Sequence, residues 1–165
     1  MLALSGGLVV PTDHYSEGFG TGGMGTGSLG ITGRRFGVRL LMGSVEPGTR
    51  GPTNDLYSAR LGSPVEVREA IVPVELQGIA AFPSQTSRVV VALQAGAGFH
   101  NVTVRRKGTD DELDDFNRFG FSIGAGARYM ISANKPAMSL GLHDVFHGTG
   151  ADRYHTVQLE LSFVI

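Results

Sequence analysis

Three residues near the carboxyl end of the chain have side chains suited to acyl-transfer chemistry. His147 and Thr149 flank a single glycine, and Glu160 follows in the last apolar segment. A hydroxyl becomes a nucleophile when a base takes its proton and an acid orients that base, all within hydrogen-bond reach. Glu160 lies deep in its segment, so the spacing does not give the three residues a consistent placement. We therefore expect no enzyme and keep a hydrolase built on this set as the alternative.

The only acidic cluster, Asp110 to Asp115, follows a basic triplet, Arg105 to Lys107. Calcium prefers several oxygen ligands, but this spacing does not match an EF-hand loop, so the cluster is expected to be a solvated tip. The glycine-rich run from Gly20 to Gly25 has no strand–loop–helix unit around it and does not indicate a dinucleotide site. We expect no metal and no cofactor.

Composition limits the remaining function classes. The chain has 165 residues, which fits one domain over 1–165, and its 14 basic residues nearly balance 15 acidic ones. A net charge of -1 gives no general attraction to nucleic acid. The absence of cysteine excludes disulfides, thiolate metal sites and thiol nucleophiles. The 25 glycines, with charged residues at only 18%, point away from a helical bundle.

Apolar residues alternate with small or polar ones along most of the chain, which predicts an all-β fold. The cleanest alternation runs from Phe119 to Ile131. Val65 to Ala80 changes phase near Arg68 and contains Pro73, so we expect a β-bulge there. Eight strands are predicted: Leu2 to Val10, Met24 to Ile31, Phe36 to Val45, Val65 to Ala80, Val89 to Phe99, Phe119 to Ile131, Met138 to about Phe146, and Val157 to Ile165.

The connections between these strands alternate in length. Short links are expected at Thr32 to Arg35, Phe82 to Ser87 and Ser132 to Pro136. Long ones are expected at Pro11 to Gly23, Glu46 to Pro64, Arg105 to Arg118, and Gly148 to His155. Short turns at one end and long loops at the other describe an antiparallel up-and-down meander of even strand number, which closes into a barrel.

The content of the two faces decides which barrel is expected. The apolar face is an uncharged band of Val, Leu, Ile, Ala and Phe, as lipid requires, whereas a soluble lipocalin-like ligand-binding barrel would reverse the faces and stays the alternative. An arginine at the bilayer midplane costs about 2–4 kcal/mol on the lipid face, so Arg39 and Arg128 should point into the lumen. The prediction is an eight-stranded antiparallel up-and-down transmembrane β-barrel.

Eight strands enclose a space that side chains can fill, so the lumen should be plugged. Arg39 and Arg128 can pair with Glu75 and Glu160 in this space. Five further polar residues would complete the hydrogen bonds: Gln77, Gln94, His100, His143 and Gln158. We interpret the set as structural.

The strand pattern, the run Gly124 to Tyr129 and the ending His155 to Ile165 resemble the small outer-membrane β-barrels of the OmpA/OmpX type from Gram-negative bacteria. The resemblance implies a location in the bacterial outer membrane, contact with its lipid, and insertion by the barrel assembly machinery, which recognises the last strand. We expect an export signal to be absent from this sequence, since Met1 to Leu4 lacks the pattern of one. His147 and Thr149 are similar to the His-x-Ser motif of lipid A deacylases, with Thr in place of Ser.

A filled barrel leaves recognition to its loops. The segments Glu46 to Pro64 and Arg105 to Arg118 carry apolar residues: Leu56, Tyr57, Leu61, Leu113 and Phe116. These side chains could bind another envelope or surface protein, or pack together and cap the barrel, and the sequence leaves both open. On an outer-membrane barrel, Arg105, Arg106 and Lys107 would lie at the level of lipopolysaccharide phosphates and could pair with them.

Overall fold

The computed structural model describes residues 1–33, 35–83, 88–132, 137–149 and 152–164, and in it the chain forms one closed barrel. Two short helices accompany the strands: α1 (Tyr15–Gly18) and α2 (Gly51–Leu61). The strands are β1 (Leu2–Thr12), β2 (Phe19–Thr32), β3 (Phe36–Thr49), β4 (Val67–Pro83), β5 (Val89–Arg106), β6 (Glu112–Ser132), β7 (Ala137–Thr149) and β8 (Asp152–Val164).

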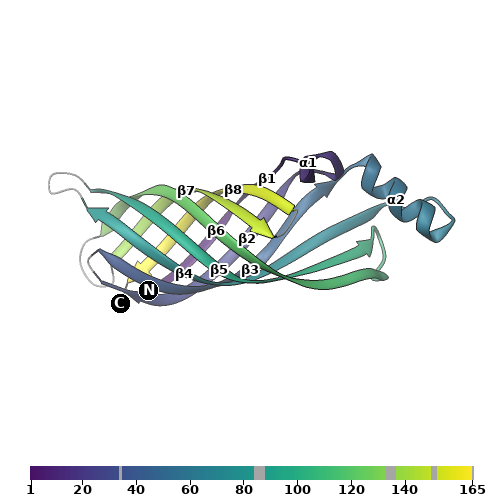
Figure 1. Ribbon diagram of the computed structural model, residues 1–165. Helices are drawn as coiled ribbons and strands as arrows, with labels where there is room; N and C mark the ends of the chain where they lie inside the picture. Colours follow the sequence, from purple (N-terminus) through teal and green to yellow (C-terminus); the bar gives the residue numbers. More distant parts are fainter. Residues whose placement is uncertain (34, 84–87, 133–136, 150–151, 165) are drawn as a thin grey trace.

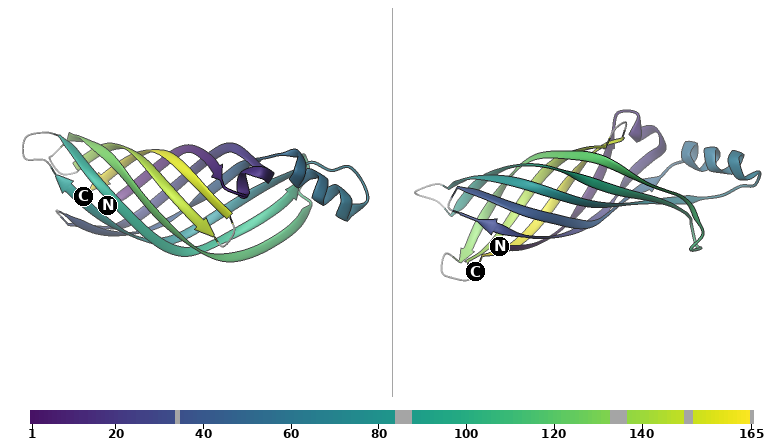
Figure 2. Two further views of the ribbon diagram at one scale, coloured as in Figure 1. Left: turned by 45° about the horizontal axis from the view of Figure 1, so that its top comes forward. Right: turned by 60° about the horizontal axis from the view of Figure 1, so that its bottom comes forward.

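Each strand pairs antiparallel with the next strand in the chain, and β1 pairs with β8 to close the barrel. That last pairing is continuous from Leu2, opposite Phe163, to Thr12, opposite Arg153. The two termini lie at one end of the tube, and both helices lie at the other (Figures 1 and 2). The predicted fold class, an eight-stranded antiparallel up-and-down barrel, is confirmed.

Alternation along each strand separates an outer from an inner face. On β6, Phe119 and Ile123 point outward and are exposed, whereas Ser122 points inward and is buried. The exposed apolar side chains form a continuous surface around the wall, which we call the apolar belt: Leu4, Leu8, Leu29, Leu40, Leu76, Leu93, Phe121, Ile123, Leu142 and Leu159 are among its members. Neither of the two helices in the described parts of the chain is long and apolar enough to cross a membrane.

The strands reach further into the predicted long loops than the sequence indicates. In place of a loop at Arg105 to Arg118, β5 continues to Arg106 and β6 begins at Glu112, so the two strands form a long hairpin. β2 begins at Phe19 and not at Met24, and β7 continues to Thr149. These corrections have one cause: strand pairing satisfies the backbone hydrogen bonds of polar segments as well as it does those of apolar ones. The predicted turns at 82–87 and 132–136 lie largely outside the described residues.

The segment Glu46 to Pro64, predicted as a loop, contains a helix. α2 has Pro52 in its first turn, where its missing N–H leaves no bond unmade, and ends at Gly62 with a left-handed φ of 68°. Both residues are recognised helix boundary signals, and they were available in the sequence.

The predicted bulge in the fourth strand is wrong. β4 pairs with β5 without a register shift from Val67 to Pro83. The apparent change of phase arises because Val67 and Ile71 point inward along with Glu69, so that apolar residues occupy both faces of this end of the strand.

Candidate functional site: the barrel lumen and the helix-bearing end

The part of the lumen nearer the short-turn end holds a buried charge cluster. Glu160 on β8 accepts a hydrogen bond at Oε2 from Arg39 Nη1, over 2.5 Å. Its other oxygen, Oε1, lies 2.9 Å from Nη2 of Arg128 on β6. The side chains of Arg39 and Glu160 are 1% and 2% exposed, and that of Arg128 is 11% exposed. One buried carboxylate thus balances the positive charges of two buried guanidinium groups.

Neutral polar groups complete the coordination of these charges. Arg39 donates from Nε to Gln77 Oε1 over 2.9 Å and from Nη2 to Gln94 Oε1 over 2.8 Å. Arg128 Nε lies 3.4 Å from His143 Nε2, which accepts that bond when the imidazole is neutral. Arg39 therefore keeps partners besides Glu160, whereas Arg128 depends mainly on the carboxylate.

A second polar cluster surrounds Glu75 on β4. Its Oε1 lies 2.8 Å from His100 Nε2 and 3.4 Å from His147 Nδ1. Its Oε2 accepts hydrogen bonds from Ser122 Oγ, over 2.5 Å, and from Gln77 Nε2, over 2.9 Å. Gln77 joins the two clusters, because its amide oxygen accepts from the Arg39 guanidinium while its nitrogen donates to Glu75.

The nine residues assigned to the lumen by the sequence all point into it, but Glu75 pairs with histidines and not with an arginine. Gln158 lies beside the same network and donates to Thr156 Oγ1 over 2.6 Å. His143 approaches Glu160 only to 3.9 Å. Ser122, which donates a hydrogen bond to Glu75, was not predicted as a lumen residue. Its position between the outward-pointing Phe121 and Ile123 could have identified it, because alternation places it on the inner face.

An apolar plug closes the lumen toward the end that carries the helices. It consists of buried side chains from five strands and α1: Val9, Tyr15, Val45, Ile71, Val102 and Tyr154. Tyr154 stacks on His147, with ring centroids 4.8 Å apart, so the plug rests directly on the Glu75 cluster. Tyr15 donates a hydrogen bond to the buried carboxylate of Glu69. This plug was not predicted: Tyr15, Val102 and Tyr154 lie beyond the predicted strands, and alternation along a strand does not show that Val9, Val45 and Ile71 meet them at one level.

The structure does not assemble the hydrolase set. His147 contacts Glu75 and also Thr156, whose Oγ1 lies 3.1 Å from His147 Nε2. The hydroxyl of Thr149 is buried and has no hydrogen-bond partner among the described residues. Glu160 is occupied by the two arginines. The three side chains face the closed lumen, where a lipid ester in the membrane could not reach them.

The apolar residues of the helix-bearing end divide into two groups. Leu56 and Leu61 on α2 are 67% and 41% exposed. Tyr57 and Leu113 instead pack against a small buried cluster of Val65, Val67 and Val104, and Phe116 packs against the plug. The sequence had grouped these five residues as one candidate surface, whereas the structure leaves only the two leucines open.

Polar contacts hold α2 against the β5–β6 hairpin and the start of β4. Tyr57 donates a hydrogen bond to Asp114 Oδ2 over 3.0 Å, and Arg60 Nη1 lies 2.7 Å from the same oxygen. Burial, together with the hydrogen bond to the Asp114 carboxylate, raises the pKa of Tyr57 to about 12. Asn54 accepts from the backbone N–H of Val67 over 2.9 Å. The helix is thus fixed by side chains from three separate positions on its surface.

The basic triplet at the hairpin tip lies among carboxylates. Lys107 Nζ is 2.9 Å from Glu66 Oε2, and this contact lowers the pKa of Glu66. Arg105 lies 3.7 Å from Glu112, and Arg106 lies 3.9 Å from Asp111. These are exposed pairs, which water screens, so the cations remain able to exchange partners.

No protein-family model and no curated protein sequence matches the chain. Among solved structures, Neisserial surface protein A (NspA) superposes with a TM-score of 0.68 at 12% identity, covering 97% of this chain and 93% of that one. The chain is an eight-stranded barrel of the bacterial outer-membrane type.

Two further solved barrels share this architecture at similar coverage. The N-terminal β-barrel domain of Pseudomonas aeruginosa OprF matches with a TM-score of 0.54 at 15% identity, over 98% of this chain and 96% of that one. Ail, the attachment invasion locus protein of Yersinia pestis, matches with a TM-score of 0.51 at 12% identity over the same shares of the two chains. At these identities the outer-membrane-type barrel is what the proteins have in common.

Proposed function

We propose that this outer-membrane-type barrel is a membrane-anchored structural and binding protein with a closed lumen, which acts through the end that carries α2 and the β5–β6 hairpin. The observation that carries the proposal is the occlusion of the lumen. The charge cluster, the Glu75 cluster and the apolar plug follow one another along the barrel axis and are buried at each level. A solute crossing the barrel would have to separate buried ion pairs, which costs several kcal/mol.

The apolar belt supports placement in the outer membrane. It surrounds the barrel with exposed Leu, Val, Ile and Phe side chains. Soluble monomers rarely expose a continuous apolar surface of this extent, whereas the lipid-facing wall of a membrane barrel requires one. The short-turn end would then face the periplasm, and α2 would stand outside the cell. Insertion by the barrel assembly machinery and contact with outer-membrane lipid are parts of the same proposal.

Electrical recording tests the closed lumen. The purified chain, reconstituted in planar bilayers, should give no steady conductance. A double variant that shortens the plug, Ile71→Ala with Tyr154→Ala, should admit a small leak, which shows that the assay detects opening. Mobility on gels with and without heating checks that both proteins are folded barrels. A large steady conductance from the unaltered chain would overturn the proposal.

The exposed leucines of α2 are the proposed contact with another envelope or surface protein. Removal of 54–61 should abolish co-purification of that partner while the barrel retains its heat-modifiable mobility. The finer variant is Leu56→Ser with Leu61→Ser, matched by Asp55→Asn on the same helix as the control. Loss of thermal stability in the leucine variant, with the partner retained, would show that these residues cap the barrel.

Lipopolysaccharide is the proposed partner of the basic triplet. The acidic neighbours of Arg105, Arg106 and Lys107 are exposed and weakly held, so multivalent phosphates could displace them. Replacing all three residues by glutamine should weaken binding to lipopolysaccharide vesicles at low salt. Equal binding by the variant and the unaltered chain would reject this contact.

A further inference from the structure

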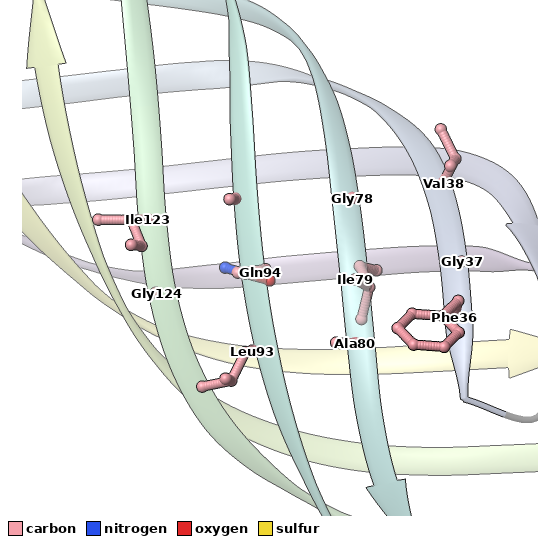
Figure 3. A pocket seen from close by; sticks show the side chains of 11 residues that line it. Phe36, Gly37, Val38, Gly78, Ile79, Ala80, Leu93, Gln94, Ile123 and Gly124 are labelled. Atoms are coloured by element: carbon pink, nitrogen blue, oxygen red, sulfur yellow. The ribbon is translucent and has the colours of Figure 1, made fainter.

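The outer wall of the barrel has an apolar groove close to its short-turn end. The groove has a volume of about 580 Å³ and crosses β3, β4, β5 and β6. In Figure 3, Phe36 and Val38 stand on one side, Leu93 and Ile123 stand on the other, and the strand between them presents Gly78 and Ala80. The groove is thus a trough with large apolar walls and a floor of small residues, set into the apolar belt.

Strand register creates this trough. Val38 lies opposite Gly78, Gly78 lies opposite Ala95, and Ala95 lies opposite Ile123, so two small residues stand between two large ones across four strands. A Cβ added at Gly78 would meet only the carbonyl oxygen of Ala95, at an ordinary contact distance of 3.8 Å. Packing within the barrel therefore does not require glycine here, and the space above Gly78 is open to an occupant from outside.

A cation stands at the short-turn end of the groove. A smaller hollow of about 270 Å³ shares Phe36 and Ala80 with the groove and is also lined by Arg35. Arg35 is exposed, and no carboxylate of the described residues lies within ion-pair distance of it. This end of the groove thus favours an anion.

We propose that the groove binds a glycerophospholipid of the periplasmic leaflet, with one acyl chain along the Gly78 floor and the phosphate at Arg35. An apolar trough that ends in an unpaired cation matches the two halves of such a lipid, and the volume is in the range of ligand sites, roughly 300–1,000 Å³. Anionic phosphatidylglycerol should bind in preference to zwitterionic phosphatidylcholine, because its headgroup has no positive charge to compete with Arg35 for the phosphate. The inference rests on the outer-membrane placement proposed above.

Native mass spectrometry of the full chain tests the site. The protein is mixed in detergent with equal amounts of phosphatidylglycerol and phosphatidylcholine, and the detergent is then removed in the spectrometer. It should retain one phosphatidylglycerol molecule. Gly78→Leu fills the floor of the groove, and Arg35→Gln removes the charge-assisted hydrogen bond to the phosphate. Each variant should lower the retention of phosphatidylglycerol about tenfold. Gly25→Leu is the matched control on the outer face of β2, where an added Cβ meets nothing within 4 Å. Arg88→Gln removes an exposed cation at the same end of the barrel that does not line the groove, so it controls for general charge.

The outcomes separate the possible occupants. Retention that falls in Gly78→Leu and Arg35→Gln, and stays in both controls, supports the site. Equal loss in Gly25→Leu or Arg88→Gln means diffuse lipid adhesion and overturns it. A dimer that disappears in Gly78→Leu means that a second copy occupies the groove, which also overturns it. The gel shift on heating reports separately whether each variant is a folded membrane barrel, so failure of the outer-membrane proposal is distinguished from failure of the lipid site.

Discussion

Replacing Glu160 by glutamine should destabilise the barrel, because this carboxylate is the shared counter-ion of two arginines. Glutamine keeps the size of the side chain, removes its charge and replaces one of the two acceptor oxygens by an NH2 donor. Arg39 and Arg128 would then remain in the lumen as two uncompensated cations.

The size of the effect follows from what each arginine keeps. Breaking a buried ion pair by removing one partner costs about 3–5 kcal/mol. Arg39 retains its hydrogen bonds to Gln77 and Gln94, which places the loss near the lower limit. We expect about 3 kcal/mol, which lowers the folding equilibrium constant by roughly two powers of ten.

Equilibrium unfolding in guanidinium chloride, in phospholipid vesicles, measures this loss through circular dichroism and gel mobility. Arg128→Leu serves as the comparison, since it leaves the contact between Arg39 and Glu160 intact and should cost less than Glu160→Gln. Replacing all three charged residues by methionine should give a barrel more stable than Glu160→Gln, since no buried charge remains unpaired. An unchanged midpoint for Glu160→Gln would refute the reasoning.

Three further perturbations test other parts of the structure. Gly7→Ala should lower the free energy of unfolding by about 1–3 kcal/mol, because its Cβ would lie 2.0 Å from the backbone oxygen of Val157. Gly6→Ala, with 3.7 Å to its nearest neighbour, should be tolerated, and equal stability of the two variants would contradict the close approach of β1 and β8. The pKa of Tyr57 is raised from 10.0 to about 12, so its hydrogen bond to Asp114 is complete below pH 10 and is lost as the pH rises toward 12. Proteolysis of α2 should therefore accelerate between pH 10 and pH 12, and Tyr57→Phe should remove this pH dependence. Lys107→Gln should leave the unfolding midpoint unchanged because its pair with Glu66 is exposed, and a clear fall would show that the hairpin tip supports the barrel.

Alternation and connection lengths were enough to predict the class of fold and which face of the wall meets lipid. A period of two fixes which residues share a face, so Arg39 and Arg128 had to point away from the belt once the apolar face was assigned to lipid. Connection lengths then restricted the topology to a meander. These properties are local in the chain, which is why they could be predicted without knowing which strands meet.

Which inward residues meet depends on how the strands are paired around the closed barrel. Closure of β1 on β8 and the register around the wall bring Glu160 between Arg39 and Arg128, and bring His100 and His147 to Glu75. Alternation places a residue inside the barrel but carries no information on its height relative to a strand far away in the sequence. For the same reason the plug, the docking of α2 on the hairpin and the trough above Gly78 became visible only when all eight strands were in register.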